Sequence, residues 1–283
     1  MNHPAELALH QYLQDAVKGN STVSPETIKQ IGDDVMAAAQ RQFGGGNKRD
    51  KFGLRMSNVG RPTCQLWYDK NKPEVALPFP TTFIMNMMIG DIVEAVFKGI
   101  LKEAGVKYED TDKVTLDLGD DSVSGSYDLV IDGAVDDIKS ASDWSYRHKF
   151  DSYESLSGGD GFGYVSQLAG YAKALGKKAG GWWVINKANG KFKYLAASGL
   201  DVDKQVARIK ETVDKVKENK FERCFEPVPE TFRGKPTGNK VLNDGCKFCS
   251  YRFDCWDNLT ELPAVKSKAK NPPTVSYIGD VVG

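Results

Sequence analysis

Apolar residues recur at helical spacing in several stretches of the chain, and the first two lie near the N-terminus. Pro4 to Val17 is predicted to form one helix. A Ser24-Pro25-Glu26 start signal predicts a second helix that runs to about Phe43. A third helix is predicted to begin near Thr82. From Met85 to Glu103 its apolar positions fall on one stripe, which is predicted to be buried: Met88, Ile92, Val96 and Ile100.

Strand-like runs follow this helix in close succession. KVTLDLG (113–119), SYDLVID (126–132) and AVDDIKSAS (134–142) each carry apolar residues at a spacing typical of strands. The last two are joined at Asp132-Gly133, a dipeptide that favours a tight hairpin turn. The pattern therefore predicts an antiparallel meander.

A polar, glycine-rich loop from 143 to 161 is expected next, followed by a helix over FGYVSQLAGYAKALG (162–176). GGWWVIN (180–186) and KFKYLAAS (191–198) then form a second hairpin across the Ala188-Asn189-Gly190 turn. The order of helix, strands, helix and strands predicts an α/β fold, with a mixed β-sheet core flanked by helices.

The remaining segments suggest how the chain is organised. GGGNKRDK (44–51) is expected to be a flexible basic linker, 202–219 a charged amphipathic helix, and the tail after Pro263 an extended arm without a fold of its own. The tail is also a candidate contact for a protein partner. We expect an N-terminal helical region, a core, a helix with a cysteine-rich segment, and a flexible tail, with the boundaries 1–81, 82–200, 201–262 and 263–283.

Composition excludes some classes of protein. The 283 residues are 40% hydrophobic, enough for a substantial core, and contain no run of apolar residues long enough to span a membrane. The N-terminus does not resemble a secretion signal, so we expect a cytoplasmic protein with no membrane partner.

Charge is balanced overall, with 38 basic and 38 acidic residues, but it is unevenly distributed. Acids crowd residues 109–137, where cations would be attracted. Bases recur over residues 204–252, a stretch that could follow a DNA backbone. The charge pattern is therefore compatible with DNA as a partner.

Candidate chemistry is concentrated on the predicted meander. Asp137 and Lys139 project to the same side of their strand, and Asp128 lies across the short turn. Two carboxylates this close repel each other unless a cation lies between them, which favours Mg²⁺. Such an ion could hold a phosphate and activate water, while Lys139 offsets the developing negative charge. Glu94 could supply another carboxylate.

Two further groups of residues are candidates for catalysis or metal binding. Gln167 and Tyr171 are spaced i,i+4 on one predicted helix face and could reach the same edge of the sheet. Cys64 and the C-x2-C-x5-C run of Cys246, Cys249 and Cys255 are typical of a cysteine-ligated metal. Spacing and chemistry alone fit zinc and an iron-sulfur cluster equally well. Cys224 is expected to be an ordinary thiol.

These motifs together resemble the PD-(D/E)XK nucleases of the RecB type. The likeness is to the iron-sulfur branch, which includes the AddB nuclease domain, the CRISPR-adaptation exonucleases and phage-encoded relatives. It extends from about Leu54 to Trp256. The matching motifs are G-x3-E at Gly90 and Glu94, G-x-x-D at Gly125 and Asp128, D-x-K at Asp137 to Lys139, Q-x3-Y at Gln167 and Tyr171, and the four cysteines.

The resemblance implies a restriction-endonuclease-like core and a C-terminal iron-sulfur segment. It implies that Glu94, Asp128, Asp137 and the Ile138 carbonyl hold Mg²⁺ or Mn²⁺, and that Lys139 assists the attacking water. It also implies a structural 4Fe-4S cluster on the four cysteines. Glu94 replaces the more usual histidine and Asp137 the more usual glutamate, so metal geometry and preference are where this chain departs most from the pattern.

The resulting hypothesis is a metal-dependent DNA exonuclease of DNA recombination, repair or degradation. The resemblance implies 5′ to 3′ action on single strands or duplex ends, in the cytosol of a bacterium or of a phage-infected host. Trp182, Trp183, Tyr164 and Tyr146 are candidates for stacking on bases. One alternative is a non-catalytic DNA-binding or assembly module with a structural metal. Another is an electron-transfer or redox-sensing protein.

Overall fold

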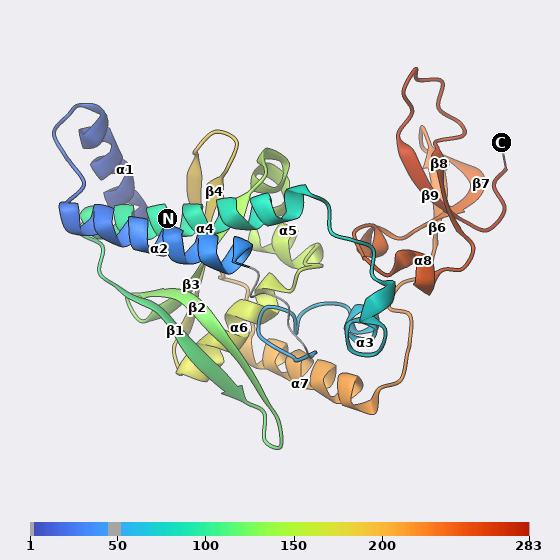
Figure 1. The fold of residues 1–283 in the computed structure, drawn as a ribbon, viewed down its shortest axis with the longest axis horizontal. Coiled ribbons are helices and arrows are strands. Elements are labelled where there is room, and N and C mark those ends of the chain that lie inside the picture. The colour runs from blue at the N-terminus through green and yellow to red at the C-terminus, as the bar shows by residue number, and fades with distance from the viewer. Residues whose placement is uncertain (1–2, 45–51, 283) are drawn as a thin grey trace. The chain divides into compact units, whose positions relative to one another are not determined.

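The computed structural model describes residues 3–44 and 52–282. The predicted basic linker at 44–51 falls outside this range except for Gly44. The chain divides into two compact units (Figure 1). Unit 1 comprises Met1–Gly60 and Pro80–Asp214, and unit 2 comprises Arg61–Phe79 and Lys215–Gly283. Among the described helices, none combines the length and the apolar character needed to cross a bilayer.

Unit 1 is an α/β unit, as predicted. Its described strands form one sheet in the order β1-β2-β3-β4-β5, in which β3 and β4 run parallel and the other neighbours antiparallel. The strands are β1 (Tyr108–Asp117), β2 (Ser122–Ile131), β3 (Ala134–Ala141), β4 (Lys178–Asn186) and β5 (Phe192–Ala196). Asp132 and Gly133 both have positive φ and close the β2–β3 hairpin, so the predicted turn is confirmed.

The helices of unit 1, apart from α5 (Tyr153–Gly158), agree closely with the sequence pattern. They are α1 (Pro4–Val17), α2 (Pro25–Phe43), α4 (Thr82–Glu103), α5, α6 (Tyr164–Leu175) and α7 (Val202–Glu218), the last of which continues into unit 2. The Ser24 hydroxyl accepts a hydrogen bond from the Thr27 N–H at the start of α2, which confirms the predicted start signal.

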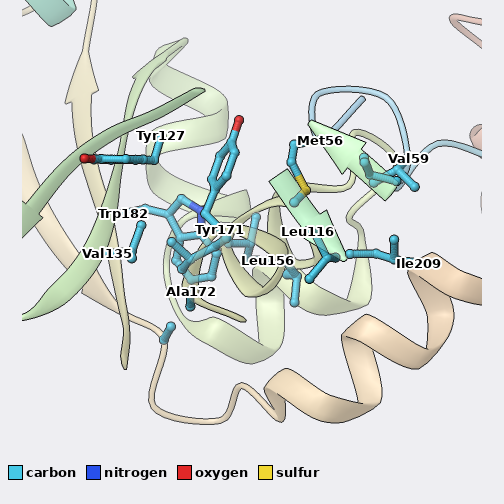
Figure 2. Close-up of a cluster of buried hydrophobic side chains, with 14 of the residues drawn as sticks. Met56, Val59, Leu116, Tyr127, Val135, Leu156, Tyr171, Ala172, Trp182 and Ile209 are labelled. Carbon is cyan, nitrogen blue, oxygen red and sulfur yellow. The ribbon is translucent and has the colours of Figure 1, made fainter. Parts of the chain in front are cut away.

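An apolar core covers each face of this sheet. Side chains of α6 pack on one face against residues such as Val135 and Trp182, and Ile209 of α7 belongs to the same apolar cluster (Figure 2). On the other face, α1 and α4 pack against residues such as Ile138 and Trp183. Successive strand residues point to opposite faces, so each core draws on alternate positions of β3 and β4.

Two predictions about the helices and loops of unit 1 are wrong. The stripe Met88, Ile92, Val96 and Ile100 of α4 is only half-buried. The buried positions are Ala95, Phe97, Lys98, Gly99 and Leu101. α4 is covered from two sides, because Phe97 and Leu101 pack on the sheet while a Cβ on Gly99 would touch Ile31 of α2. The predicted loop at 143–161 contains a short π-helix (Ser145–Lys149) and α5.

Unit 2 has its own sheet, which the sequence did not predict. Its described strands are ordered β6-β7-β9-β8: β6 (Val228–Phe232), β7 (Lys235–Val241), β8 (Leu259–Pro263) and β9 (Thr274–Ile278). The unit also contains α3 (Thr63–Asn71), the 3-10 turns η1 (Pro73–Val75) and η3 (Asp244–Cys246), and α8 (Arg252–Cys255).

The tail after Pro263 is not the extended arm that was predicted. Its strand β9 lies between β7 and β8, and the Tyr277 side chain is fully buried. The tail completes the sheet of unit 2 because its backbone donors and acceptors are satisfied there by neighbouring strands.

Candidate active site and thiol pocket

The site of unit 1 lies where β2 and β3 part. Their pairing begins at the Asp132-Gly133 turn and ends at Leu129 opposite Asp136. Beyond that point the N–H of Ile138 donates to the Asp128 Oδ2, over 2.7 Å. The Asp128 side chain thus takes the place of a backbone acceptor in the ladder.

The face of the sheet toward which the side chains of β2 alternate also changes at this position. Tyr127 belongs to the core under α6, whereas Leu129 belongs to the core under α4, although regular alternation would place both on one face. The ladder between β1 and β2 also skips Asp128. This irregularity lets an aspartate on β2 approach β3 with its carboxylate.

Asp137 and Lys139 project to the same side of β3, as predicted. The Lys139 Nζ lies 2.5 Å from the Asp137 Oδ2, and Asp137 is 2% exposed. The Lys139 ammonium is thus in direct contact with this buried oxygen, although the two do not form a hydrogen bond of regular geometry. A buried carboxylate oxygen with spare acceptor capacity faces this site.

Burial and mutual repulsion shift the acids of the site in one direction. Burial, followed by the neighbouring Asp137, raises the pKa of Asp128 to about 6. Burial also raises the pKa of Asp137, against the attraction of Lys139. Burial alone would lower the pKa of Lys139, but Asp137 and Asp128 raise it above its ordinary value. The site therefore holds a firmly protonated lysine beside carboxylates that resist ionisation.

Glu94 of α4 is near enough to Asp128 and Asp137 for their charges to act on one another. Burial and the charge of Asp128 raise its pKa, and its own charge acts on Asp137. Its Oε1 forms a 2.9 Å ion pair with the Nζ of Lys98 one turn later on α4. Lys98 is buried and also pairs with Asp110 at 3.1 Å. Lys98 was not singled out from the sequence, although its i,i+4 spacing from Glu94 was a usable signal.

Gln167 and Tyr171 contact each other on α6, as their spacing predicts. The Gln167 Nε2 donates to the Tyr171 Oη over 3.3 Å. Burial raises the pKa of Tyr171 to about 12, and the charges of Asp137 and Asp128 contribute to that shift. Gly125 makes this approach feasible, because a Cβ there would lie 3.0 Å from the Tyr171 ring. The phenol thus remains neutral beside the two aspartates.

The neighbouring Asp136 faces the opposite core and serves the fold. Its carboxylate accepts hydrogen bonds from the Trp183 Nε1 at 3.1 Å and the Tyr194 Oη at 2.9 Å. Trp182 and Trp183 are both fully buried, one in each core. The prediction that they could stack on bases is therefore wrong, whereas Tyr164 and Tyr146 keep part of their surface.

The four predicted cysteines line one pocket within unit 2. Aromatic rings complete its wall: Tyr68, Tyr251 and Trp256. Burial raises the pKa of Cys249 and Cys255, and it raises that of Cys246 to about 11, with the other thiols adding to the effect. Neutral thiols are favoured here, so a bound cation would be needed to hold them as thiolates.

Cys224 lies beside this group rather than apart from it. The Cys64 N–H donates to the Cys224 Sγ over 3.1 Å, and the Thr63 Oγ1 lies 3.3 Å from the same sulfur. Hydrogen bonding to Cys224 and burial raise the pKa of the Cys64 thiol, while that of Cys224 falls to about 6. No spacing in the sequence could have linked Cys224 to Cys64.

The described residues contain no three His, Cys, Asp or Glu side chains gathered as a ready-made metal site. In unit 1, lysine ammonium groups stand next to the carboxylates of Asp137 and Glu94. Neither a family model nor a curated protein matches the chain. A solved structure described as the crystal structure of SSO0001 aligns with 83% of this chain and 98% of its own, at 14% identity and a TM-score of 0.42.

Proposed function

We propose that this protein is a divalent-metal-dependent deoxyribonuclease. In this proposal, unit 1 has a restriction-endonuclease-like core of the PD-(D/E)XK type. The observation that carries the proposal is the grouping of Asp128, Asp137 and Lys139 where β2 and β3 part. A cytosolic exonuclease of DNA recombination, repair or degradation, in a bacterium or a phage-infected host, is the activity we infer.

The donor set suits a hard cation. Glu94, Asp128 and Asp137, with the carbonyl of Ile138, would hold Mg²⁺ or Mn²⁺. Support comes from the buried Asp137 oxygen with spare acceptor capacity and from the raised pKa values of all three acids. When bound, such an ion polarises the scissile phosphate and lowers the pKa of a water ligand.

Lys139 would act through its charge. Its raised pKa keeps the ammonium protonated at neutral pH, so it is a poor general base. It can instead donate hydrogen bonds to the attacking water and to the phosphate oxygens, where negative charge develops in the transition state. Tyr171 and Gln167 are neutral donors on the same side and would orient the phosphate.

The chemistry of unit 2 is proposed to be structural. Cys64, Cys246, Cys249 and Cys255 would ligate a 4Fe-4S cluster, which would tie α3 to η3 and α8. Four thiolates would also accept zinc, and the family resemblance favours the cluster. Iron and sulfide analysis of the purified protein, together with its visible absorption, decides between the two.

A cleavage assay tests the proposal. Purified protein is incubated with end-labelled single-stranded and duplex DNA and with a circular control, with and without Mn²⁺. Asp137→Ala and Lys139→Ala should each lower the metal-dependent rate by at least about 100-fold. Asp112→Ala and Lys113→Ala alter exposed charges on β1 and should leave the rate unchanged.

Each outcome of this assay is informative. Release of labelled nucleotides from linear but not circular DNA supports an exonuclease, and the position of the label reports polarity. DNA binding without hydrolysis would instead support the non-catalytic alternative. Full cleavage by both Asp137→Ala and Lys139→Ala would contradict the proposed roles.

A further inference from the structure

A stack of aromatic rings in unit 1 leads from the core to the surface. Phe150 is buried, Tyr164 half-buried and Phe162 59% exposed. The Phe150 and Tyr164 ring centroids are 6.0 Å apart with planes 23° from parallel, and those of Tyr164 and Phe162 are 5.6 Å apart at 12°. The outermost ring of the stack is thus a large apolar surface left open to solvent.

Lysine ammonium groups accompany this stack. The Lys149 Nζ lies 4.5 Å from the Tyr164 ring centroid and 4.8 Å from that of Phe162. The Lys139 Nζ lies 5.1 Å from the Tyr164 centroid. Tyr164 therefore links the proposed catalytic lysine to Lys149 and Phe162, and the two ammonium groups flank the stack, with the Asp160 carboxylate near Lys149.

The segment that carries Phe162 is held in place before any ligand arrives. The Asp160 carboxylate accepts hydrogen bonds from the N–H groups of Tyr164 at 3.0 Å and Val165 at 2.8 Å. Gly163 has φ +77° and packs on Gly60, and a Cβ at Gly163 would lie 2.5 Å from the Gly60 Cα. Because this backbone is fixed and the Phe162 ring already stacks on Tyr164, little conformational entropy would be lost on binding.

The alternation of aromatic faces and ammonium groups fits the chemistry of an unpaired nucleic-acid strand. Such a strand exposes base faces that stack on aromatic rings, and its phosphates pair with cations. A duplex hides the base faces inside its own stack. Acidic proteins or free phosphate would use the lysines but not the exposed ring.

We propose that Phe162 is a stacking platform for an unpaired base, and that Lys149 pairs with the adjoining phosphate of the strand entering the site at Lys139. This inference rests on the proposed nuclease function and narrows its substrate to strands with unpaired ends. Phe162 and Lys149 are positioning residues in this scheme, since neither touches the reacting phosphate.

Binding measured without hydrolysis tests the platform. The full chain is titrated, in buffer without added Mg²⁺ or Mn²⁺ and without chelator, against a fluorescent oligothymidylate and a blunt duplex of equal length. Phe162→Ala should weaken single-strand binding about 5- to 150-fold, the range found when one stacked base is lost, and should leave duplex binding nearly unchanged. Phe162→Trp should restore the affinity. Phe232→Ala is the matched control, because it removes a ring under Arg233, 5.4 Å away, in unit 2.

A second readout reports stacking itself. A 2-aminopurine base near the strand end should be quenched by the unaltered protein and not by Phe162→Ala. Unchanged affinity and quenching in Phe162→Ala, or equal losses on single strand and duplex, would overturn the platform. An oligouridylate arm distinguishes DNA from RNA, and preference for RNA would overturn the DNA assignment. Quenching without metal-dependent cleavage would uphold the platform and contradict the nuclease proposal.

Discussion

The acidic site of unit 1 and the thiol pocket of unit 2 each gather groups that repel one another when ionised, yet they are supported differently. Asp128 and Asp137 stand on strands backed by a large core on each face. Their charges are offset by Lys139 within the fold. The thiols stand on short elements, η3 and α8 among them, beside a small cluster of Leu242, Trp256, Leu259 and Ile278.

The contrast predicts which of the two sites depends on a bound metal for its structure. A hairpin with internal counter-charges can keep its geometry through its own core and hydrogen bonds. Short turns around neutral thiols contribute little packing, so metal binding would supply much of the folding free energy there. We expect unit 1 to be metal-activated and unit 2 to be metal-stabilised.

Loss of the cysteine-bound metal should have the largest effect. Structural metals of small domains contribute about 10 kcal/mol or more, so Cys246→Ser should unfold much of unit 2. Hydrogen exchange should rise over 215–282 and remain slow in the sheet of unit 1. Cys224→Ser is the control, because it leaves the four predicted ligands in place and keeps an acceptor for the Cys64 N–H, so this variant should retain its metal. If both units of Cys246→Ser were equally protected from hydrogen exchange, the proposed difference in their dependence on metal would be contradicted.

Truncation of the buried Tyr277 side chain in the tail should have the second-largest effect on stability. The Tyr277 ring is fully buried, its hydroxyl donates to Glu230 at 2.9 Å, and it accepts from the Val265 N–H at 3.1 Å. Tyr277→Ala should destabilise unit 2 by about 3–5 kcal/mol, as large-to-small core changes do, and Tyr277→Phe by about 1 kcal/mol. Thermal unfolding measures both. If Tyr277→Ala left the thermal stability unchanged, the tail would not contribute to the stability of unit 2.

The smallest of the three effects is a pH dependence of metal binding in unit 1. Because the pKa of Asp128 is raised to about 6, a proton competes with the metal below that pH. Mg²⁺ affinity should rise by up to about tenfold per pH unit from pH 5 to pH 6 and level off above about pH 7. Calorimetry in buffers of different ionisation enthalpy should detect the released proton. Affinity that is flat or falls over this range would show that Asp128 does not titrate with binding.

Local chemistry explains which features could be predicted from the sequence. The Asp132-Gly133 turn and the shared face of Asp137 and Lys139 follow from turn preferences and strand alternation, which act between near neighbours. The start of α2 at Ser24 and the pairing of Gln167 with Tyr171 are local in the same sense.

Features set by distant partners could not be read in this way. β9 exists because β7 and β8 leave hydrogen-bonding groups for it, and Lys98 is buried because acids from Glu94 and Asp110 converge on it. The ring stack ending at Phe162 joins the π-helix region to the start of α6. Each of these depends on tertiary contact, on which periodicity carries no information.

Anomalous diffraction from crystals soaked in Mn²⁺ tests the central claim most directly. The proposal predicts a peak about 2.0–2.2 Å from carboxylate oxygens of Asp128 and Asp137 and from the Ile138 carbonyl, and loss of that peak in Asp137→Ala. A peak confined to the exposed acids of β1, or no peak between Asp128 and Asp137 at saturating Mn²⁺, would contradict it.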